Sequence, residues 1–234
     1  MADERFHERA GRKIVFTGHY GSGKTEIAVS LALLLAAENA GKLALIDLDI
    51  VNPFFRSREM REALEAGGVC VCGSVFREEV TTELPALGAN LRAPLEDPAC
   101  RVIVDAGGND SGALILNQFR EYFTDEETTM LAVVNANRPD TGSLGGALGH
   151  IAAIESATGL RIAGIVNNSH LLRETTAGTV VMGYEFCKRV CEATGKQLWC
   201  SCYPAGIVKP EELSGLDGGL LPLGLRMRPT WLDC

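Results

Sequence analysis

Short apolar runs alternate with longer stretches of helical periodicity along most of the chain. The apolar runs are rich in Val, Ile and Leu, as buried strands are, and they lie at residues 13–17, 43–46, 69–72, 102–104, 130–134, 162–166 and 198–200. Between them, apolar residues recur at helical spacing in the stretches 24–40, 57–66, 145–157 and 179–193. In the first of these stretches, Ile27, Leu31 and Leu34 fall on one helix face.

This alternation predicts an α/β domain with a doubly wound, mostly parallel sheet and helices on both faces. Strands that are apolar throughout are typical of parallel sheets, because helices cover both faces of such a sheet. We expect a single domain over residues 13–234, preceded by a polar N-terminal lead-in at residues 1–12. The polar stretch 74–100 contains three prolines and is predicted to be a long excursion between strands.

The charge and hydropathy of the chain exclude several classes of protein. The net charge of −8 argues against a general nucleic-acid binder, since affinity for phosphate backbones depends on clustered Lys and Arg. The longest nearly apolar run, residues 27–37, is shorter than the roughly 20 residues that span a bilayer. The first residues carry no apolar signal segment, and prolines within 215–234 disfavour an amphipathic membrane helix. We therefore expect a cytoplasmic protein that binds neither nucleic acid nor membrane.

A glycine-rich motif follows the first predicted strand and begins the first predicted helix. Its sequence, Gly-His-Tyr-Gly-Ser-Gly-Lys-Thr, matches the P-loop pattern G-x-x-x-x-G-K-[ST]. Glycines let backbone N–H groups turn towards phosphate oxygens, the lysine is predicted to reach the outer phosphates, and the threonine hydroxyl to hold Mg²⁺. The residues expected to contact the nucleotide here are Gly18, His19, Tyr20, Gly21, Ser22, Gly23, Lys24 and Thr25.

Acidic residues end two further predicted strands. Asp47 and Asp49 follow the strand at 43–46, and Asp105 follows the strand at 102–104. In open parallel sheets, ligands bind outside the carboxyl ends of the strands, so these carboxylates are predicted to face a Mg²⁺–nucleotide site. A single Asp at such a position could equally cap the next helix. Three of them beside a P-loop favour the site.

Four motifs occur in an order that resembles the SIMIBI class of P-loop NTPases. They are the P-loop, Asp-Leu-Asp at 47–49, Asp-Ala-Gly-Gly at 105–108 and Ile-Val-Asn-Asn at 165–168. Within this class the sequence is most similar to the MinD/ParA-type ATPases, whose relatives include nitrogenase iron protein and the nickel-insertion ATPase of carbon monoxide dehydrogenase, over about residues 13–205. The resemblance implies a P-loop nucleotide-binding domain that binds ATP with Mg²⁺ and releases ADP.

The resemblance also implies a role for individual residues. Thr25 and Asp105 would hold Mg²⁺, directly or through water, and Asp47 would lie near the metal. Lys24 would bind the phosphates, and Asp49 matches the family acid that orients the attacking water. Phosphoryl transfer needs mainly positioning and charge stabilisation from the protein, so this short set is nearly a complete catalytic site.

The two remaining motifs imply a sensor and a base contact. Gly108 matches the glycine whose amide senses the γ-phosphate, which makes 106–112 a candidate switch segment. Asn167 or Asn168 matches the asparagine that reads the base. The guanine-specific sequence N-K-x-D does not occur there, so ATP is the expected nucleotide.

The P-loop departs from the family pattern at two positions. The family motif begins Gly-Lys-Gly-Gly, and its signature lysine reaches a partner's nucleotide across a dimer. In this chain His19 stands in place of that lysine, and Tyr20 stands in place of the glycine that follows it. His19 could substitute for the lysine when protonated, but an unperturbed histidine is mostly neutral at pH 7. Arg56 and Arg58 are alternative sources of positive charge.

The chain contains eight cysteines, four of them in two C-x-C pairs. Cys70 and Cys72 lie in one predicted strand, and Cys200 and Cys202 lie at another. Residues i and i+2 of a strand face the same side, so either pair could give two thiolates to a metal or cluster. Buried cysteines that pack as small apolar residues are the alternative, and the sequence leaves both open.

The leading functional hypothesis is a Mg²⁺-dependent ATPase whose nucleotide state switches its contact with a protein partner. The partner could be a metalloenzyme under maturation, or a second copy of the chain in a nucleotide-dependent homodimer. One alternative is a small-molecule kinase or ligase similar to dethiobiotin synthetase, which also lacks the signature lysine. The other is a nucleotide-binding scaffold or metal carrier with negligible turnover. ADP formation that depends on a partner, on a small substrate, or on neither distinguishes the three.

Overall fold

The computed structural model describes residues 6–48, 57–73, 84–108 and 115–227. Within these residues, eight strands form one parallel sheet in the order β3-β2-β4-β1-β5-β6-β7-β8. The strands are β1 (Lys13–Thr17), β2 (Lys42–Asp47), β3 (Val69–Gly73), β4 (Cys100–Asp105), β5 (Thr128–Val134), β6 (Gly164–Asn167), β7 (Gln197–Pro204) and β8 (Leu220–Leu223). The strand order runs outwards in both directions from the β4–β1 pair, as in a doubly wound fold.

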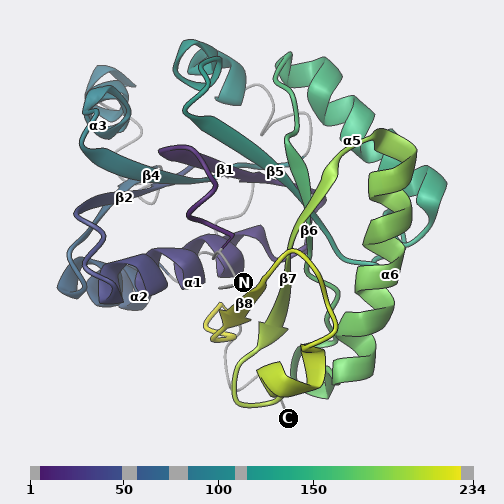
Figure 1. Cartoon of the computed structure of the whole chain (residues 1–234). Helices are drawn as coiled ribbons and strands as arrows, with labels where there is room; N and C mark the ends of the chain where they lie inside the picture. The colour runs from purple at the N-terminus through teal and green to yellow at the C-terminus, as the bar shows by residue number, and fades with distance from the viewer. Residues whose placement is uncertain (1–5, 49–56, 74–83, 109–114, 228–234) are drawn as a thin grey trace.

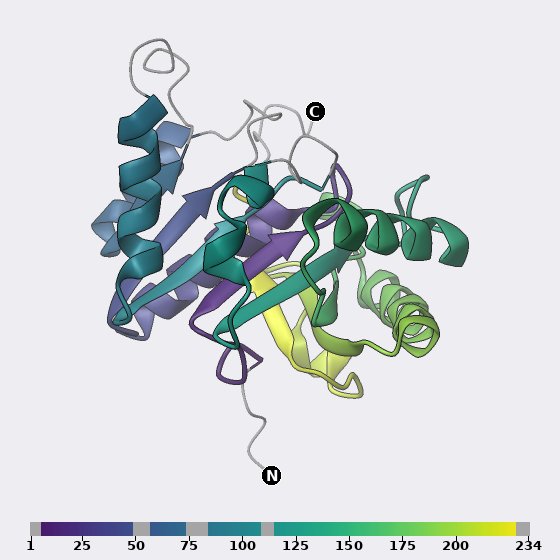
Figure 2. The ribbon, with the colours of Figure 1, turned by 90° about the horizontal axis from the view of Figure 1, so that it is seen from above.

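Helices cover both faces of this sheet. The helices are α1 (Lys24–Ala37), α2 (Ser57–Ala66), α3 (Leu84–Glu96), α5 (Leu144–Thr158) and α6 (Ala177–Thr194), with shorter 3-10 turns η1 (Arg120–Phe123), η2 (Leu172–Glu174) and η3 (Pro210–Leu213). The first two pack against one face, and α3, α5 and α6 contribute to the core on the other (Figure 1). Figure 2 shows α3 in front of the sheet and α1 behind it.

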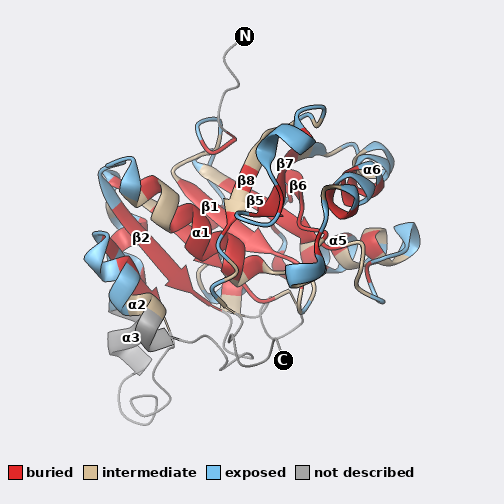
Figure 3. Cartoon of the chain, turned by 90° about the horizontal axis from the view of Figure 1, so that it is seen from below, coloured by how far each residue is buried: buried red, intermediate tan, exposed pale blue. Residues whose placement is uncertain are grey.

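Burial explains why the strands are apolar throughout. The central strand β1 is buried at all of its positions, and the strands are red along most of their length in Figure 3. On the side of α1, Ile27 and Leu31 pack with Phe16, and on the opposite side Val15 packs with residues of the second helix layer. Because both faces are covered, neither face can be polar, and the hydrophobic pattern predicts the fold class correctly.

The structure contains the predicted strands and helices, with shifted ends. The first helix ends at Ala37 instead of residue 40, and β6 covers Gly164–Asn167 instead of 162–166. The prediction of an excursion at 74–100 is wrong in its second half, which forms α3 and the start of β4. The short strand β8, which contains Pro222, was not predicted; as the last strand of the sheet it tolerates a proline.

Arg12, which is distant in sequence, stabilises the C-terminal end of the proline-containing helix α3. Pro94 lies inside α3, where it cannot donate a backbone hydrogen bond. Arg12 lies across the end of this helix and donates to the carbonyl oxygens of Pro94, Leu95, Asp97 and Cys100. These contacts satisfy carbonyl groups that a helix end leaves without partners.

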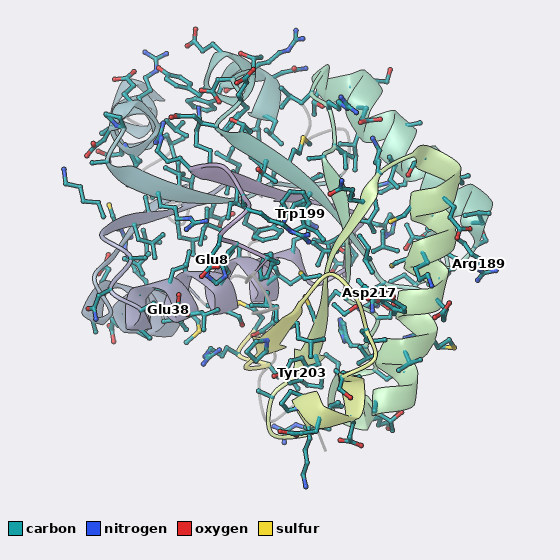
Figure 4. All side chains as sticks on the ribbon, viewed as in Figure 1. Glu8, Glu38, Arg189, Trp199, Tyr203 and Asp217 are labelled. Atoms are coloured by element: carbon teal, nitrogen blue, oxygen red, sulfur yellow. The ribbon has the colours of Figure 1, made fainter. Side chains whose placement is uncertain are left out.

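The described part of the predicted lead-in, residues 6–12, packs onto the domain. Phe6 is buried, and its carbonyl oxygen accepts a hydrogen bond from the indole nitrogen of Trp199 at 3.2 Å. The guanidinium of Arg9 lies 4.7 Å from the centre of the same ring. Trp199, a residue of β7, is labelled in Figure 4 above α1.

Candidate nucleotide-binding site

The sheet brings two acidic residues together at its carboxyl edge. In the strand register, Asp47 at the end of β2 is paired with Asp105 at the end of β4, and Asp105 is paired with Phe16 of β1. The P-loop follows β1 directly, so both carboxylates lie beside it. They are 7% and 2% exposed, respectively. Asp49, the third predicted acid, falls outside the described residues, as does the 109–112 part of the candidate switch.

The P-loop turns back on itself before α1 begins. Gly18, Gly21 and Gly23 all have positive φ, and Gly23 is the N-cap of α1 with φ of 90°. A Cβ on Gly23 would lie 2.2 Å from the side-chain nitrogen of Asn168, so only glycine fits there. The loop therefore ends with free N–H groups at the first turn of a helix, where a phosphate is favoured by hydrogen bonding and by the helix dipole.

Lys24 is the first residue of this helix and is buried, with 5% of its surface exposed. Its ammonium group is 3.4 Å from the carbonyl oxygen of His19 within the same loop. His150 also lies near it. Burial, followed by the charges of His19 and Lys24, lowers the pKa of His150 to about 4, so the His150 ring is neutral at pH 7.

The hydroxyl of Thr25 donates a hydrogen bond of 2.5 Å to one carboxylate oxygen of Asp105. This contact joins the start of α1 to the end of β4. Hydroxyl and carboxylate oxygens are the hard ligands that Mg²⁺ prefers, and Mg²⁺ usually keeps several waters and binds through one or two carboxylates plus phosphate oxygens. The donor set of Thr25, Asp105 and the neighbouring Asp47 therefore fits a Mg²⁺–nucleotide site.

The two candidate base-reading asparagines have different surroundings. The amide of Asn167 is buried and fully used inside the fold: its nitrogen donates to Val180 O and Ser201 Oγ, and its oxygen accepts from Ser169 N. The amide nitrogen of Asn168 instead donates to the carbonyl oxygen of Ser22 in the P-loop at 2.7 Å. Asn168 thus holds the phosphate-binding loop against the end of β6.

The sequence analysis missed one arginine that contacts the P-loop. Arg138 lies in the turn after β5, and its Nε donates to the carbonyl oxygen of Gly21 at 2.8 Å. The guanidinium lies so close that a Cβ on Gly21 would be 3.0 Å from its central carbon. The turn itself is fixed, because Gly142 N donates to the Arg138 carbonyl oxygen at 2.7 Å. The sequence 135–140 contains no pattern that assigns a function to this arginine.

The side chains of His19 and Tyr20 in the P-loop point in different directions. His19 turns inwards: its Nε2 lies 3.4 Å from a carboxylate oxygen of Asp140, and its ring contacts the His150 ring edge-on. Tyr20 is 65% exposed. His19 therefore joins the P-loop to the turn after β5, and Tyr20 is the P-loop side chain that faces solvent.

Gly108 lies against the beginning of the P-loop. A Cβ at this position would be 1.8 Å from the carbonyl oxygen of Gly18. The loop after β4 and the loop after β1 are therefore in direct backbone contact. A change in the position of one loop must displace the other.

Comparisons with known proteins give similarity of fold only. No protein-family model and no curated protein matches this sequence. Among solved structures, the cell division protein FtsY from Thermotoga maritima is similar with a TM-score of 0.54 and 16% identity, over 91% of this chain and 67% of that one. FlhF complexed with GTP and Mg²⁺ has a TM-score of 0.43 and 19% identity, over 67% of this chain and 54% of that one.

The chain thus spans about half to two thirds of the length of these structures. The similarity to FtsY confirms the predicted α/β P-loop NTPase fold with an all-parallel sheet. No helix of the described residues has the length and apolar character needed to cross a membrane.

Proposed function

We propose that this chain is a Mg²⁺-dependent ATPase of the SIMIBI class, similar to the MinD/ParA proteins, whose nucleotide state switches its contact with a protein partner. The observation that carries the proposal is the 2.5 Å contact between Thr25 and Asp105 beside the P-loop. It places a hydroxyl and a carboxylate next to the lysine and the helix N-terminus that would hold the phosphates. That combination is needed for phosphoryl transfer and is not needed to build the sheet.

In the proposed mechanism, the protein acts by position and charge. The N–H groups at the start of α1 and the ammonium of Lys24 bind the β- and γ-phosphates and stabilise the charge that develops on them. Thr25 and Asp105 would hold Mg²⁺, with Asp47 near it, and the cation would neutralise phosphate charge. The resemblance assigns the positioning of the attacking water to Asp49.

The most exposed large apolar side chains of the described residues support a protein contact on this same face. They all follow the carboxyl ends of strands, from the P-loop after β1 to the turn after β7, and they are Tyr20, Leu144, Leu171, Val181, Met182 and Ile207. Exposed apolar groups that gather at one end of a sheet are typical of an interaction surface. We propose that the partner, either another protein or a second copy of the chain, binds here when ATP is bound.

ATP is expected to bind more tightly than GTP, by at least about tenfold, which corresponds to about 1.4 kcal/mol. The guanine-specific sequence N-K-x-D does not occur at the end of β6, where the chain reads Asn167-Asn168-Ser169-His170. Burial lowers the pKa of His170 to about 4, so this ring is neutral at pH 7. Titration of the protein with fluorescent ATP and GTP analogues, together with ADP release and solution mass with each nucleotide, tests the proposal. Equal affinity for both bases would contradict the assignment to ATP, and failure to bind either would contradict the site.

Arg138→Ala is expected to weaken nucleotide binding by about 10- to 100-fold, because a hydrogen bond from a charged donor contributes about 1.5–3 kcal/mol. The loss acts through the P-loop conformation, since Arg138 holds the Gly21 carbonyl. Arg173→Ala, which removes an arginine from the nearby turn η2, is the control. The affinity for Mg²⁺–ATP measured by calorimetry checks the prediction, and an Arg138→Ala protein with the parent affinity would exclude this role.

A further inference from the structure

Two C-x-C pairs lie on different strands of the sheet, and only one of them has a thiol that is open to solvent. Cys200 and Cys202 of β7 are 0% and 2% exposed. Cys70 of β3 is exposed, whereas its neighbour Cys72 is buried, with 9% of its surface exposed. The spacing is identical in both pairs, so the sequence cannot separate them, but only the pair on β3 has a thiol that a dissolved cation can reach.

The pair on β3 has the separation of a chelating pair of sulfurs. The Sγ atoms of Cys70 and Cys72 are 3.6 Å apart. Two sulfurs bound at about 2.3 Å to one tetrahedral cation are about 3.75 Å apart, which follows from the usual Zn–S distance and the tetrahedral angle. Linear coordination at the same bond length would need about 4.6 Å. The observed spacing therefore fits a tetrahedral cation with almost no movement of either side chain.

A disulfide fits this pair poorly. The Cα atoms of residues i and i+2 in a strand are separated by about 6.6 Å, at the upper limit of the range in which disulfides form. The two Cβ atoms of such a pair also point in the same direction, whereas a disulfide needs them about 3.8 Å apart. Closing the bond would require β3 to leave its register with Leu43–Asp47 of β2.

The position of the pair allows a ligand to approach. The strand β3 is the last strand at its end of the sheet, next to β2 alone. Between the two cysteines, the carbonyl oxygen of Val71 accepts a hydrogen bond from Arg61. Among the described residues, no group of three or more Cys, His, Asp or Glu side chains is arranged to hold a metal. The pair can thus give two ligands, and water or a small ligand fills the other positions.

We propose that Cys70 and Cys72 form a two-thiolate binding site for an exchangeable, tetrahedral, thiophilic d¹⁰ cation such as Zn²⁺. Binding breaks two S–H bonds and forms two metal–sulfur bonds, so each divalent cation that binds the dithiol releases two protons to solvent and changes no oxidation state. Soft thiolate ligands select such cations over Mg²⁺. A thiol must lose its proton to bind a cation as thiolate, so the apparent affinity of the pair for the cation is expected to rise with pH. Cys72 is paired with Ile46 in the strand register, one residue before Asp47, but the existence of the cation site does not depend on the function proposed above.

Cd²⁺ alone is the probe, because cadmium–thiolate bonds absorb in the ultraviolet. The reduced full-length protein is expected to bind one Cd²⁺ per chain with this absorption, to lose at least about 90% of it in Cys70→Ser and in Cys72→Ser, and to keep it in Cys191→Ser. Cys191 is the matched control, a partly exposed thiol on α6. A second measurement, proton release in weakly buffered solution, is expected to give about two protons per cation for the parent protein.

Three results would overturn the proposal. They are absence of the absorption from the parent protein, its persistence in Cys72→Ser, and equal loss in Cys191→Ser. The thermal unfolding of each variant in the absence of metal separates loss of the site from loss of the fold. None of these measurements involves nucleotide, so failure of this proposal and failure of the proposed ATPase activity are distinguishable.

Discussion

Lys24→Ala is expected to weaken Mg²⁺–ATP binding by about two to three orders of magnitude and to reduce ADP formation to background. Lys24 is 5% exposed and lies within the P-loop, 3.4 Å from the His19 carbonyl oxygen. Its removal leaves the phosphates without their partner in a site from which water is largely excluded. Loss of one partner from such a charged pair typically costs about 2–5 kcal/mol, and each 1.4 kcal/mol is tenfold in affinity.

Lys42→Ala is the matched control for this variant. Lys42 also begins a secondary-structure element, but it is exposed and pairs at 2.8 Å with Asp97, at the opposite end of β2 from Asp47. An exposed ion pair contributes about 0–1 kcal/mol, so this variant is expected to bind nucleotide like the parent. Calorimetric titration measures the affinity of both variants for Mg²⁺–ATP, and ADP release measures their turnover. Thermal unfolding shows whether both variants are folded. If Lys24→Ala bound Mg²⁺–ATP as well as Lys42→Ala, the proposed site would be wrong.

The parts of the fold that were predicted correctly depend on local sequence, and those that were missed depend on distant contacts. The strands around β1 are apolar at every position because helices cover both faces, and that pattern is visible in the sequence. The helix α3 was missed because it contains Pro94 and because its end is satisfied by Arg12, more than eighty residues earlier in the chain. No local signal indicates that partner.

In the candidate site, too, the local motif was visible in the sequence and the contacts between distant residues were not. The P-loop was predictable because its glycines, Lys24 and Thr25 lie within eight consecutive residues and form one local motif. The contacts of Arg138 and Asn168 with the loop were not, because they join strands β5 and β6 to β1 and depend on the strand order. The sequence likewise left Asn167 and Asn168 equivalent, and only the packing of β6 separates the amide used inside the fold from the one at the P-loop.

Gly108→Ala is expected to lower ATP turnover by more than about tenfold and the free energy of unfolding by about 1–3 kcal/mol, the usual cost of overpacking. The added methyl group would lie 1.8 Å from the carbonyl oxygen of Gly18 and 2.3 Å from its carbonyl carbon. Both are backbone atoms, so no side-chain rotation relieves the clash. Either the loop after β4 or the start of the P-loop must shift, and the proposed γ-phosphate sensor would then be separated from the phosphates.

Gly149→Ala provides the control for this substitution. Gly149 lies in α5 with nothing within 4 Å of the position of an added Cβ, so alanine there is expected to raise the free energy of unfolding by about 0.5–1 kcal/mol and to leave turnover unchanged. The measurements are single-turnover ADP formation and the affinity for ADP. A switch defect lowers turnover far more than ADP affinity, because only the γ-phosphate is affected, whereas a collapsed P-loop lowers both. A Gly108→Ala protein with the stability and turnover of the parent would refute the contact between the two loops.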